Sequence, residues 1–539
     1  MTTLRGALSS VLALLLGASA ARAQNALLPL DDIAYTYIDA LLSRGALRDL
    51  AIIERPYSVG AVRSAISTTR EQLHDAGALR WLSAIAAAAD KYAPGVIASD
   101  SGVFAASLGA YGVAQTSGNR DLMQSNRINT TAPGFAVRAL IASGPFTGAL
   151  RVLADRRMRV DPEFFGRKDR VLAARTEEGY VGVTSRFATL QIGRVGRSWG
   201  LPGQLGLMLS NGAYTYDHLY LRLGTDKVHL SSVVARLDDE FANFTTDTLA
   251  HRYFSAHRLG AKIGSVEAGI SESVIYGGIG AGFRPNLSNP VSPAFLAQYS
   301  DGDKINVALG ADLLYRAATG AMFGAQVFVD DFQIDQCDLC GEPPGIGVAV
   351  TADGIPLIQG ARGFASYARV NSLTYRAPDR FERFTSRTVG LGQRNSDFDE
   401  VKLGIDVGPI LPAPLRVYLA YRRQGAGDYR QPYPDAPKRN TWPTIFEGVV
   451  VKTLRVGASG ALRVGDGVEI AADAGVNRST NDLRSIGATR TRFEGRLRVA
   501  LEPSWGRLRT SLFCCAPERT LRRAPTCPSG RRFSDRSRR

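Results

Sequence analysis

Apolar and polar residues alternate with a period of two from about Gly102 onward, over roughly 400 residues, and this alternation limits the possible folds more than any other feature of the chain. In Lys304 to Arg316, one face is apolar, whereas charged, polar and small residues dominate the other. The pattern recurs in Glu400 to Val407, Leu415 to Arg422 and Thr491 to Glu502. Because successive side chains of a strand point to opposite faces, each segment predicts a two-faced β-strand.

Strand length and composition favour a membrane barrel over a soluble sandwich. The strands are about ten residues long, which is enough to cross a bilayer at a tilt. Several apolar faces carry an aromatic residue near one end, as an interfacial girdle does: Tyr315, Tyr421 and Phe493. The polar faces carry charges of both signs, which suits a wet or ion-paired interior. A soluble sandwich also alternates but rarely sustains so many long hairpins, and a closed barrel leaves no sheet edge.

The connections between strands are of two kinds. The short ones are Ser143 to Pro145, Gly224 to Thr225, Gly264 to Ser265, Ala317 to Gly320, Pro412 to Pro414 and Gly465 to Gly467. The long ones are Thr116 to Pro133, Asp155 to Glu178, Gly193 to Asp217, Gly277 to Gly302, Asp335 to Gly363 and Gln424 to Thr444. Short turns on one side and long, outward loops on the other are typical of outer-membrane barrels. We therefore predict an all-β transmembrane antiparallel β-barrel of about 16 to 18 strands, with Ala377 to Phe398 left unassigned.

The N-terminal part of the chain differs from the barrel. A basic start, an apolar core and the small-x-small motif Ala21-Arg22-Ala23 predict a cleaved signal peptide over residues 1–23. Residues 24–98 show helical periodicity, with Asp31 or Asp32 and Ser58 as candidate caps, and are assigned to a periplasmic α-helical module. The barrel is assigned to residues 99–513. This organisation predicts a location in the outer membrane of a Gram-negative bacterium.

The segment after Phe513 does not fit the barrel pattern. Residues 514–539 contain eight arginines and only two carboxylates, and are assigned to a basic disordered tail. We interpret this tail as the product of a reading-frame change, with a functional basic tail as the alternative. Arg507 to Phe513 is then the last candidate strand, and one closing strand is expected to be missing. Because the tail supplies +6 of the formal net charge of +15, nucleic acid is not a predicted partner.

Two long loops supply the candidate binding residues. Gly193 to Asn211 contains five glycines, a proline and a tryptophan, which predict a shaped loop, either extracellular or folded into the barrel mouth. The other loop follows Gln424. Aromatic faces stack on sugar rings and arginine binds carboxylates, so these loops predict a site for an acidic glycan, with loop-to-loop packing as the alternative. The candidate glycan-binding residues are Arg194, Arg197, Trp199, Asn211, Tyr214, Tyr216, Tyr429, Tyr433 and Trp442.

Two motifs and the overall plan resemble the capsule-assembly (Wzi-like) family of outer-membrane proteins. The first motif is Tyr35-Thr-Tyr-Ile-Asp-Ala-Leu-Leu-Ser-Arg-Gly45 followed by Arg55-Pro-Tyr-Ser58. The second is Gln191-Ile-Gly-Arg194 with Trp199-Gly200, Pro202-Gly203 and Leu209-Ser-Asn211. The plan is a leader, a short helical module and a long barrel. The resemblance implies an 18-stranded barrel, a periplasmic helical module and a lectin-like role in holding capsular or related polysaccharide, and it supplies no catalytic residues.

Motifs for catalysis or metal binding do not stand out. The sequence has no HExxH and no Gly-x-Ser-x-Gly motif. Cys337 and Cys340 form a single CxxC, which is half a zinc site at best and in an exported protein suits a small disulfide or two thiols. The five histidines are predicted to be surface or lumen residues: His74, His218, His229, His251 and His257. We therefore predict no enzyme activity, no cofactor and no metal site.

Three functions remain open from the sequence. The first is an outer-membrane barrel that binds and anchors or organises capsular or extracellular polysaccharide. The second is a porin or sugar-selective diffusion channel, and the third is a barrel enzyme acting on lipid or glycan. The helical module favours the first, because a plain porin has little use for it. The predicted partners are acidic capsular or extracellular polysaccharide, outer-membrane lipid and the polysaccharide export machinery.

Overall fold

The structure is a computed structural model that describes residues 25–93, 103–245, 247–301, 305–330, 345–435, 442–465 and 467–502. The predicted signal peptide, all five cysteines, the candidate strand Arg507 to Phe513 and the basic tail lie outside the described residues.

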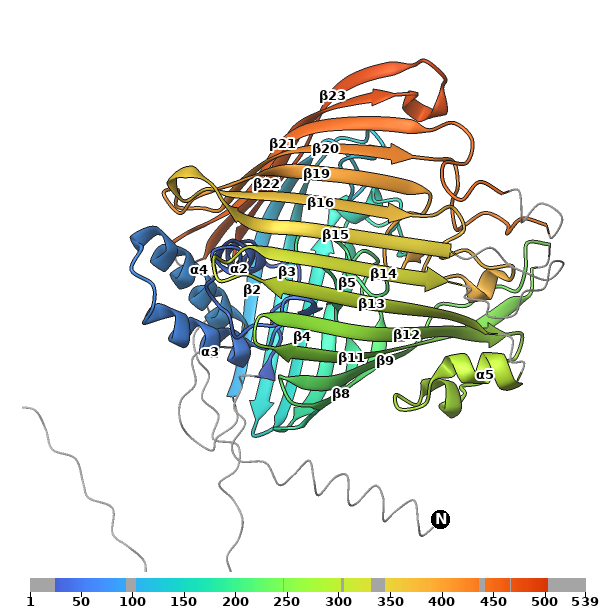
Figure 1. Ribbon diagram of the computed structural model, residues 1–539, viewed down its shortest axis with the longest axis horizontal. Coiled ribbons are helices and arrows are strands. Elements are labelled where there is room, and N and C mark those ends of the chain that lie inside the picture. Colours follow the sequence, from blue (N-terminus) through green and yellow to red (C-terminus); the bar gives the residue numbers. More distant parts are fainter. Residues whose placement is uncertain are drawn as a thin grey trace, which may run out of the picture.

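Within the described residues, 18 antiparallel strands form a closed barrel (Figure 1). Each strand pairs with the next along the chain, and a further strand of two residues, β10 (Glu240–Phe241), pairs only with β11. The barrel strands are β2 (Val103–Gln115), β3 (Thr130–Ser143), β4 (Phe146–Asp155), β5 (Ala173–Thr184), β6 (Ala188–Arg194), β8 (Asp217–Gly224), β9 (Val228–Arg236), β11 (Leu249–Ile263), β12 (Val266–Gly278), β13 (Asn306–Arg316), β14 (Met322–Asp330), β15 (Gly345–Pro356), β16 (Arg362–Val370), β19 (Phe398–Val407), β20 (Leu415–Gln424), β21 (Val451–Val464), β22 (Val468–Thr480) and β23 (Thr489–Leu501).

The barrel closes between its first and last strands. Residues of β2 from Ala110 to Gln115 pair with residues of β23 from Leu501 back to Arg496. The expectation of a missing closing strand is therefore wrong, because β23 joins β22 and β2 and no strand beyond Glu502 is needed for closure.

The prediction of one continuous long loop from Asp335 to Gly363 is also wrong. The range Asp335 to Gly363 contains β15, which pairs with β14 and β16. The strand was missed because its lumen-facing side is made of small residues, which give no contrast between polar and apolar faces. A Cβ added to Gly347 would lie 3.3 Å from Leu207, so the small residue leaves room for a loop inside the barrel. The unassigned range Ala377 to Phe398 belongs mainly to the loop between β16 and β19 and contains the short pair β17 (Thr385–Ser386) and β18 (Val389–Gly390).

The strands turn their apolar faces outward, as the alternation predicts. On β13, Leu313 and Tyr315 are 51% and 48% exposed, whereas Leu314 between them is fully buried and Asp312 and Arg316 face the interior. A lipid bilayer solvates such an outer face, and the inward polar residues are satisfied by one another or by inserted segments.

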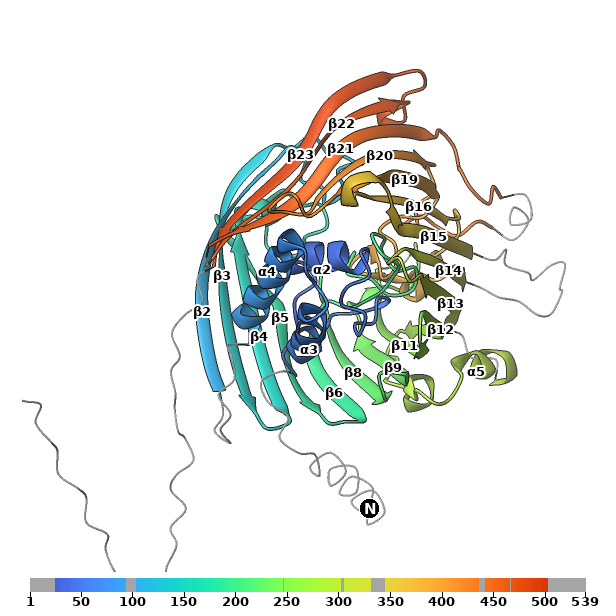
Figure 2. The same ribbon diagram turned by 60° about the vertical axis from the view of Figure 1, so that its left-hand side comes forward.

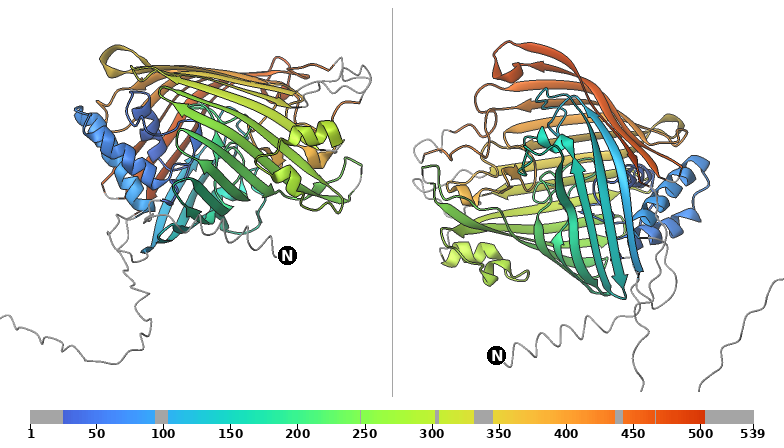
Figure 3. Two further views of the ribbon diagram at one scale, coloured as in Figure 1. Left: turned by 60° about the horizontal axis from the view of Figure 1, so that its bottom comes forward. Right: turned by 180° about the vertical axis from the view of Figure 1, so that it is seen from behind.

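Three helices form a head that lies across the end of the barrel with the short turns (Figures 2 and 3). They are α2 (Ala34–Leu42), α3 (Val59–Arg70) and α4 (Ala76–Tyr92). The predicted cap Ser58 accepts a hydrogen bond from the Ala61 N–H, and Asp75 caps α4 in the same way. No helix in the described ranges has both the length and the apolar run needed to cross a membrane.

Candidate functional site: the occupied lumen and its basic cavity

The glycine-rich loop between β6 and β8 folds into the barrel and reaches the head. Its short strand β7 (Ser198–Trp199) pairs with β1 (Glu54–Arg55) of the head. The Gly200 N–H donates to the Ile53 carbonyl at 3.1 Å, so the loop backbone completes a small sheet inside the lumen. The sequence left open whether this loop is extracellular or folded into the barrel mouth, and the structure shows it folded inward. The two sequence motifs of the family resemblance therefore meet each other directly.

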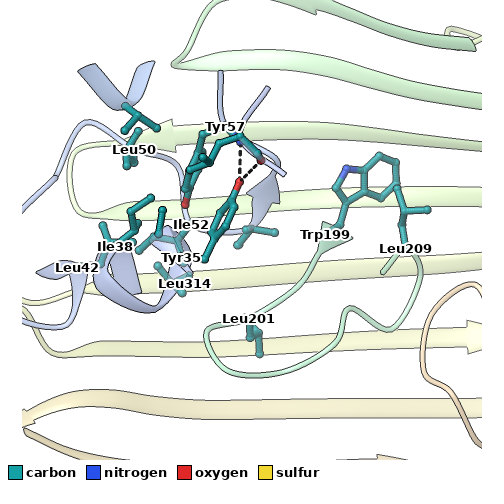
Figure 4. Packing of buried hydrophobic residues seen from close by; sticks show 14 of the residues in the cluster. Tyr35, Ile38, Leu42, Leu50, Ile52, Tyr57, Trp199, Leu201, Leu209 and Leu314 are labelled. Atoms are coloured by element: carbon teal, nitrogen blue, oxygen red, sulfur yellow. Dashed lines mark hydrogen bonds between the residues drawn. The ribbon is translucent and has the colours of Figure 1, made fainter. Parts of the chain in front are cut away.

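Glycine is required where this loop doubles back. The Trp199 N–H donates to the Leu209 carbonyl at 2.9 Å, and a Cβ on Gly206 would lie 2.3 Å from the carbonyl oxygens of both residues. Trp199 and Leu209 then lie side by side near Leu201 (Figure 4). They belong to one apolar cluster that also contains Tyr35 and Ile38 of the head.

Residues of the first motif pack against one another inside the head. Tyr35 stacks on Tyr57 with ring centroids 5.6 Å apart, and the Tyr57 N–H donates to the Tyr35 hydroxyl at 3.1 Å (Figure 4). The Arg55 guanidinium lies over both rings and pairs with Asp39 of α2. The spacing of this motif is thus explained by packing inside the head.

Four of the predicted glycan-binding residues are buried: Arg197, Trp199, Tyr429 and Tyr433. Trp199 is only 2% exposed. Arg197 donates to Nε2 of His218 at 2.8 Å and lies 3.4 Å from the ring centroid of Tyr220. The Tyr429 hydroxyl donates to the Arg394 carbonyl and accepts from the Gly390 N–H. In this conformation these side chains hold loops together.

The other five predicted residues remain accessible: Arg194, Asn211, Tyr214, Tyr216 and Trp442. Arg194 pairs with Asp217 at 2.6 Å. Tyr214 is held by two guanidinium groups, which lie 3.5 Å and 3.9 Å from its ring and belong to Arg120 and Arg175. Trp442 donates from Nε1 to Glu447 at 2.7 Å. Their role in glycan binding stays a prediction.

Polar contacts tie the head to the barrel wall around the circumference. Arg44 lies 2.8 Å from Asp406 of β19, and the Ile52 N–H donates to Glu267 of β12 at 2.7 Å. Further contacts reach β4, β11, β13 and β21: Arg151 with Asp31, Lys262 with the Leu50 carbonyl, Arg316 with the Leu50 carbonyl, and the Arg463 N–H with the Tyr37 hydroxyl. The head therefore covers the mouth at the short-turn end from several sides.

The contact with the most ion pairs is centred on Lys91 of α4. Its Nζ lies 2.6 Å from Asp32, 2.7 Å from Glu469 and 2.8 Å from Glu502, and all four side chains are buried. Burial lowers the pKa of Lys91, but the carboxylates of Asp32, Glu502 and Glu469 outweigh burial and raise the pKa above its usual range. The charged form of Lys91 thus holds the end of α4 against the wall.

Glu54 provides a second charged tie at the β1–β7 pair. Its carboxylate contacts Nε2 of His229 at 3.0 Å, accepts from Ser231 at 2.9 Å and pairs with Arg258. Burial raises the pKa of Glu54, but hydrogen bonding to His229 and the charge of Arg258 outweigh burial and lower the pKa to about 2.

A basic cavity of about 560 Å³ remains in the lumen beside the inserted loop. Its walls come from the β2–β3 loop, the inserted loop, the β16–β19 loop and the inner faces of β16 and β19 to β23, and Thr36 of α2 also lines it. Seven cationic side chains line the cavity against three carboxylates, those of Asp121, Glu400 and Asp473. The cations are Arg120, Arg394, Lys402, Arg422, Arg455, Arg496 and Arg498.

Two of these seven cations, Arg496 and Lys402, have no carboxylate partner within the described ranges, whereas the other five form ion pairs. Arg496 donates to the Asn119 carbonyl at 2.9 Å and forms no ion pair there. Lys402 forms no ion pair there either, and its Nζ lies 4.2 Å from the Tyr418 ring centroid. A cluster of like charges in a low-dielectric wall is unfavourable unless an anion or water compensates it. The two unpaired cations, Arg496 and Lys402, are therefore the groups of this cavity that an anion could compensate.

A second cavity of about 430 Å³ adjoins the first. The two share Met123, Asn395 and Arg422 in their walls. The second is lined by residues of the long loops and the adjoining strand ends, including Arg127, Arg430, Arg484, Arg490 and Arg492. The cationic lining thus continues from the lumen to the long-loop end. Lys402, Arg422 and Arg496 lie on the polar faces of three segments in which the alternation predicts strands, but only the barrel topology brings these strands around one cavity.

The buried histidine of β11 lies outside the lumen. Ser255 and His257 of β11 face outward, and Oγ of Ser255 lies 3.0 Å from Nε2 of His257. Ser255 is fully buried, and the β12–β13 loop packs on this part of the outer wall, where Glu272 accepts hydrogen bonds from the first N–H groups of α5 (Ala294–Asp301). In the described residues Glu272, the cross-strand partner of His257, makes its hydrogen bonds to α5 and none to His257.

No protein-family model matches the chain, and no curated protein matches it. Among solved structures, the fold is similar to Wzi of Escherichia coli, described as a carbohydrate-binding β-barrel involved in group 1 capsule assembly. That match has a TM-score of 0.59 and 12% identity, and covers 89% of this chain and 99% of Wzi. Two Pseudomonas aeruginosa proteins, OccK10 (OpdN) and OprD, match 74% of this chain with TM-scores of 0.39 and 0.42. Their identities are 13% and 10%, and the matches cover 98% and 94% of their chains. At 12% identity the likeness to Wzi shows the barrel fold alone.

Proposed function

We propose that this protein is an outer-membrane β-barrel that binds acidic capsular or extracellular polysaccharide at the cell surface and holds it without conducting solutes. The observation that carries the proposal is the basic cavity on the long-loop side of a lumen whose opposite mouth is covered by the head. The proposal includes export by a cleaved signal peptide and a periplasmic position for the head, where it can contact export machinery.

The chemistry of the cavity suits sugar acids. Guanidinium groups bind carboxylates by paired, charge-assisted hydrogen bonds, and burial strengthens these bonds relative to water. Tyr418 and Phe398 also line the wall, where Lys402 and Arg422 lie over their rings. Wzi, which has a similar fold, is described as carbohydrate-binding, and this supports the same class of ligand here.

The direct test combines conductance and binding on one refolded preparation of the full chain. We expect silent barrels in a planar bilayer and saturable binding of a uronate-containing polysaccharide, with a neutral polysaccharide of similar length as the matched control. Large, steady conductance without polysaccharide binding would contradict the proposal and leave the porin alternative.

A further inference from the structure

A basic row crosses the outer wall at the long-loop end of the barrel. Arg369 of β16, Asp399 of β19, Arg423 of β20 and Lys452 of β21 are successive cross-strand partners. Arg478 of β22 lies one outward position nearer to the short turns, opposite Leu454. Four cations thus share this wall with a single carboxylate.

These side chains face away from the lumen. Side chains on either side of them along each strand, such as Arg422, Thr453 and Asn477, are buried toward the interior, so Arg423, Lys452 and Arg478 point outward. Lys452 and Arg478 are exposed, and the Arg423 side chain is 42% exposed.

The row lies at the edge of the apolar band. The next outward residues toward the short turns on β21 and β22 include Leu454, Val456 and Val476, all exposed and apolar. Phe493 on the neighbouring β23 is also exposed. A barrel buries such a band in the hydrocarbon core, so the row lies at the level of the lipid head groups on the side of the long loops.

The row is unfavourable without a counter-ion. Arg423 and Lys452 are direct cross-strand partners, and like charges at such positions repel. Asp399 is occupied by Arg423, whose Nε donates to it at 2.9 Å. Within the described ranges Lys452 and Arg478 form no ion pair.

We propose that this basic row binds the phosphorylated head group of an outer-leaflet glycolipid. A head group carrying two phosphates matches several cations spread over adjacent strands, because each phosphate accepts charge-assisted hydrogen bonds from arginine and lysine. Its acyl chains then cover Leu454, Val456 and Val476. This site is independent of polysaccharide binding in the lumen.

The test compares a diglucosamine lipid carrying two phosphates with its dephosphorylated form, both added to the full chain in detergent and followed by native mass spectrometry. We expect the phosphorylated lipid to bind at least tenfold more tightly, and 0.5 M NaCl to weaken its binding. Inorganic pyrophosphate serves as the soluble competitor. Equal binding of both lipids would overturn the proposal, and so would pyrophosphate displacing the lipid at equal concentration, since the site would then be a general phosphate site.

Variants locate the site. Lys452→Gln combined with Arg478→Gln removes two charges without breaking an ion pair of the described residues, and we expect about a tenfold loss of affinity for the phosphorylated lipid. Arg186→Gln with Lys227→Gln removes two exposed charges at the short-turn end and serves as the matched control. Equal affinity in the two double variants would overturn the assignment to this row. The comparison of the two lipids on the unmodified chain decides the proposal even if a variant does not fold.

Discussion

Glu54 and Trp199 face each other as paired residues of β1 and β7, at the point where a loop from the long-loop end of the barrel meets the head. Their positions in the sequence are 145 residues apart, yet their backbones form one sheet in the lumen. This pairing explains why the head and the inserted loop share one apolar cluster. Displacement of the inserted loop should therefore release the head, and displacement of the head should release the loop.

Trp199→Ala tests this coupling. Removing a fully buried indole costs about 3–5 kcal/mol, and the loss falls on the inserted segments because the barrel ladder does not use this side chain. We expect the head to become sensitive to protease at temperatures where the strands stay intact. Trp442→Ala, at a half-exposed position outside this cluster, is the control and should leave the head protected. Equal protection of both variants would show that the loop does not hold the head.

Lys91→Met should loosen the head where the end of α4 contacts the barrel wall. The substitution leaves Asp32 buried without a cation, whereas Glu469 keeps Arg463 and Glu502 keeps Arg138; breaking a buried ion pair in this way costs about 3–5 kcal/mol. The measurement is planar-bilayer conductance, which should change from silent to intermittent opening. Lys227→Met at an exposed turn should stay silent. Silence in both variants would mean that Lys91 is not needed to keep the mouth covered.

Acid should weaken the attachment of the head through Glu54. Its folded pKa of about 2 lies below the ordinary value of 4.5, so its contribution to stability is fully present above pH 4.5 and is lost as the pH falls toward 2. We expect the midpoint for thermal loss of the helical circular dichroism signal to fall over this range. In Glu54→Gln the midpoint should be lower at pH 6 and depend less on pH. An unchanged pH profile in the variant would assign the acid sensitivity to other carboxylates.

Cations of the basic cavity should set polysaccharide affinity. Arg496→Gln with Lys402→Gln removes two charges that have no carboxylate partner in the described residues, and about a tenfold weaker binding of acidic polysaccharide, or about 1.4 kcal/mol, is the expected result. Binding is measured by surface plasmon resonance at low and high salt. Arg186→Gln with Lys227→Gln should bind normally. If the cavity variant also binds normally, the accessible loop residues such as Tyr214 and Trp442 become the candidates.

The sequence predicted the barrel from the period-two alternation together with the strand lengths and the short and long connections, because a strand with one apolar and one polar face must bury or solvate each face differently. The same local pattern located β13, β19, β20 and β23 closely. It failed at β15, whose lumen face is small to make room for Leu207, a neighbour that is distant in the sequence.

The sequence also identified the right segments for the head and the glycine-rich loop, but not their contact. Residue type suggested that Trp199 and Tyr429 bind a ligand, whereas tertiary packing buries both. Conversely, Arg422 and Arg496 were only polar positions on separate strands until barrel closure placed β23 next to β2 and curved these strands around one cavity. Alternation is a local property and can be read from the chain. Barrel closure and the segments inserted into the lumen determine which inward residues meet there. The position and lining of the basic cavity were therefore decided only by the tertiary structure.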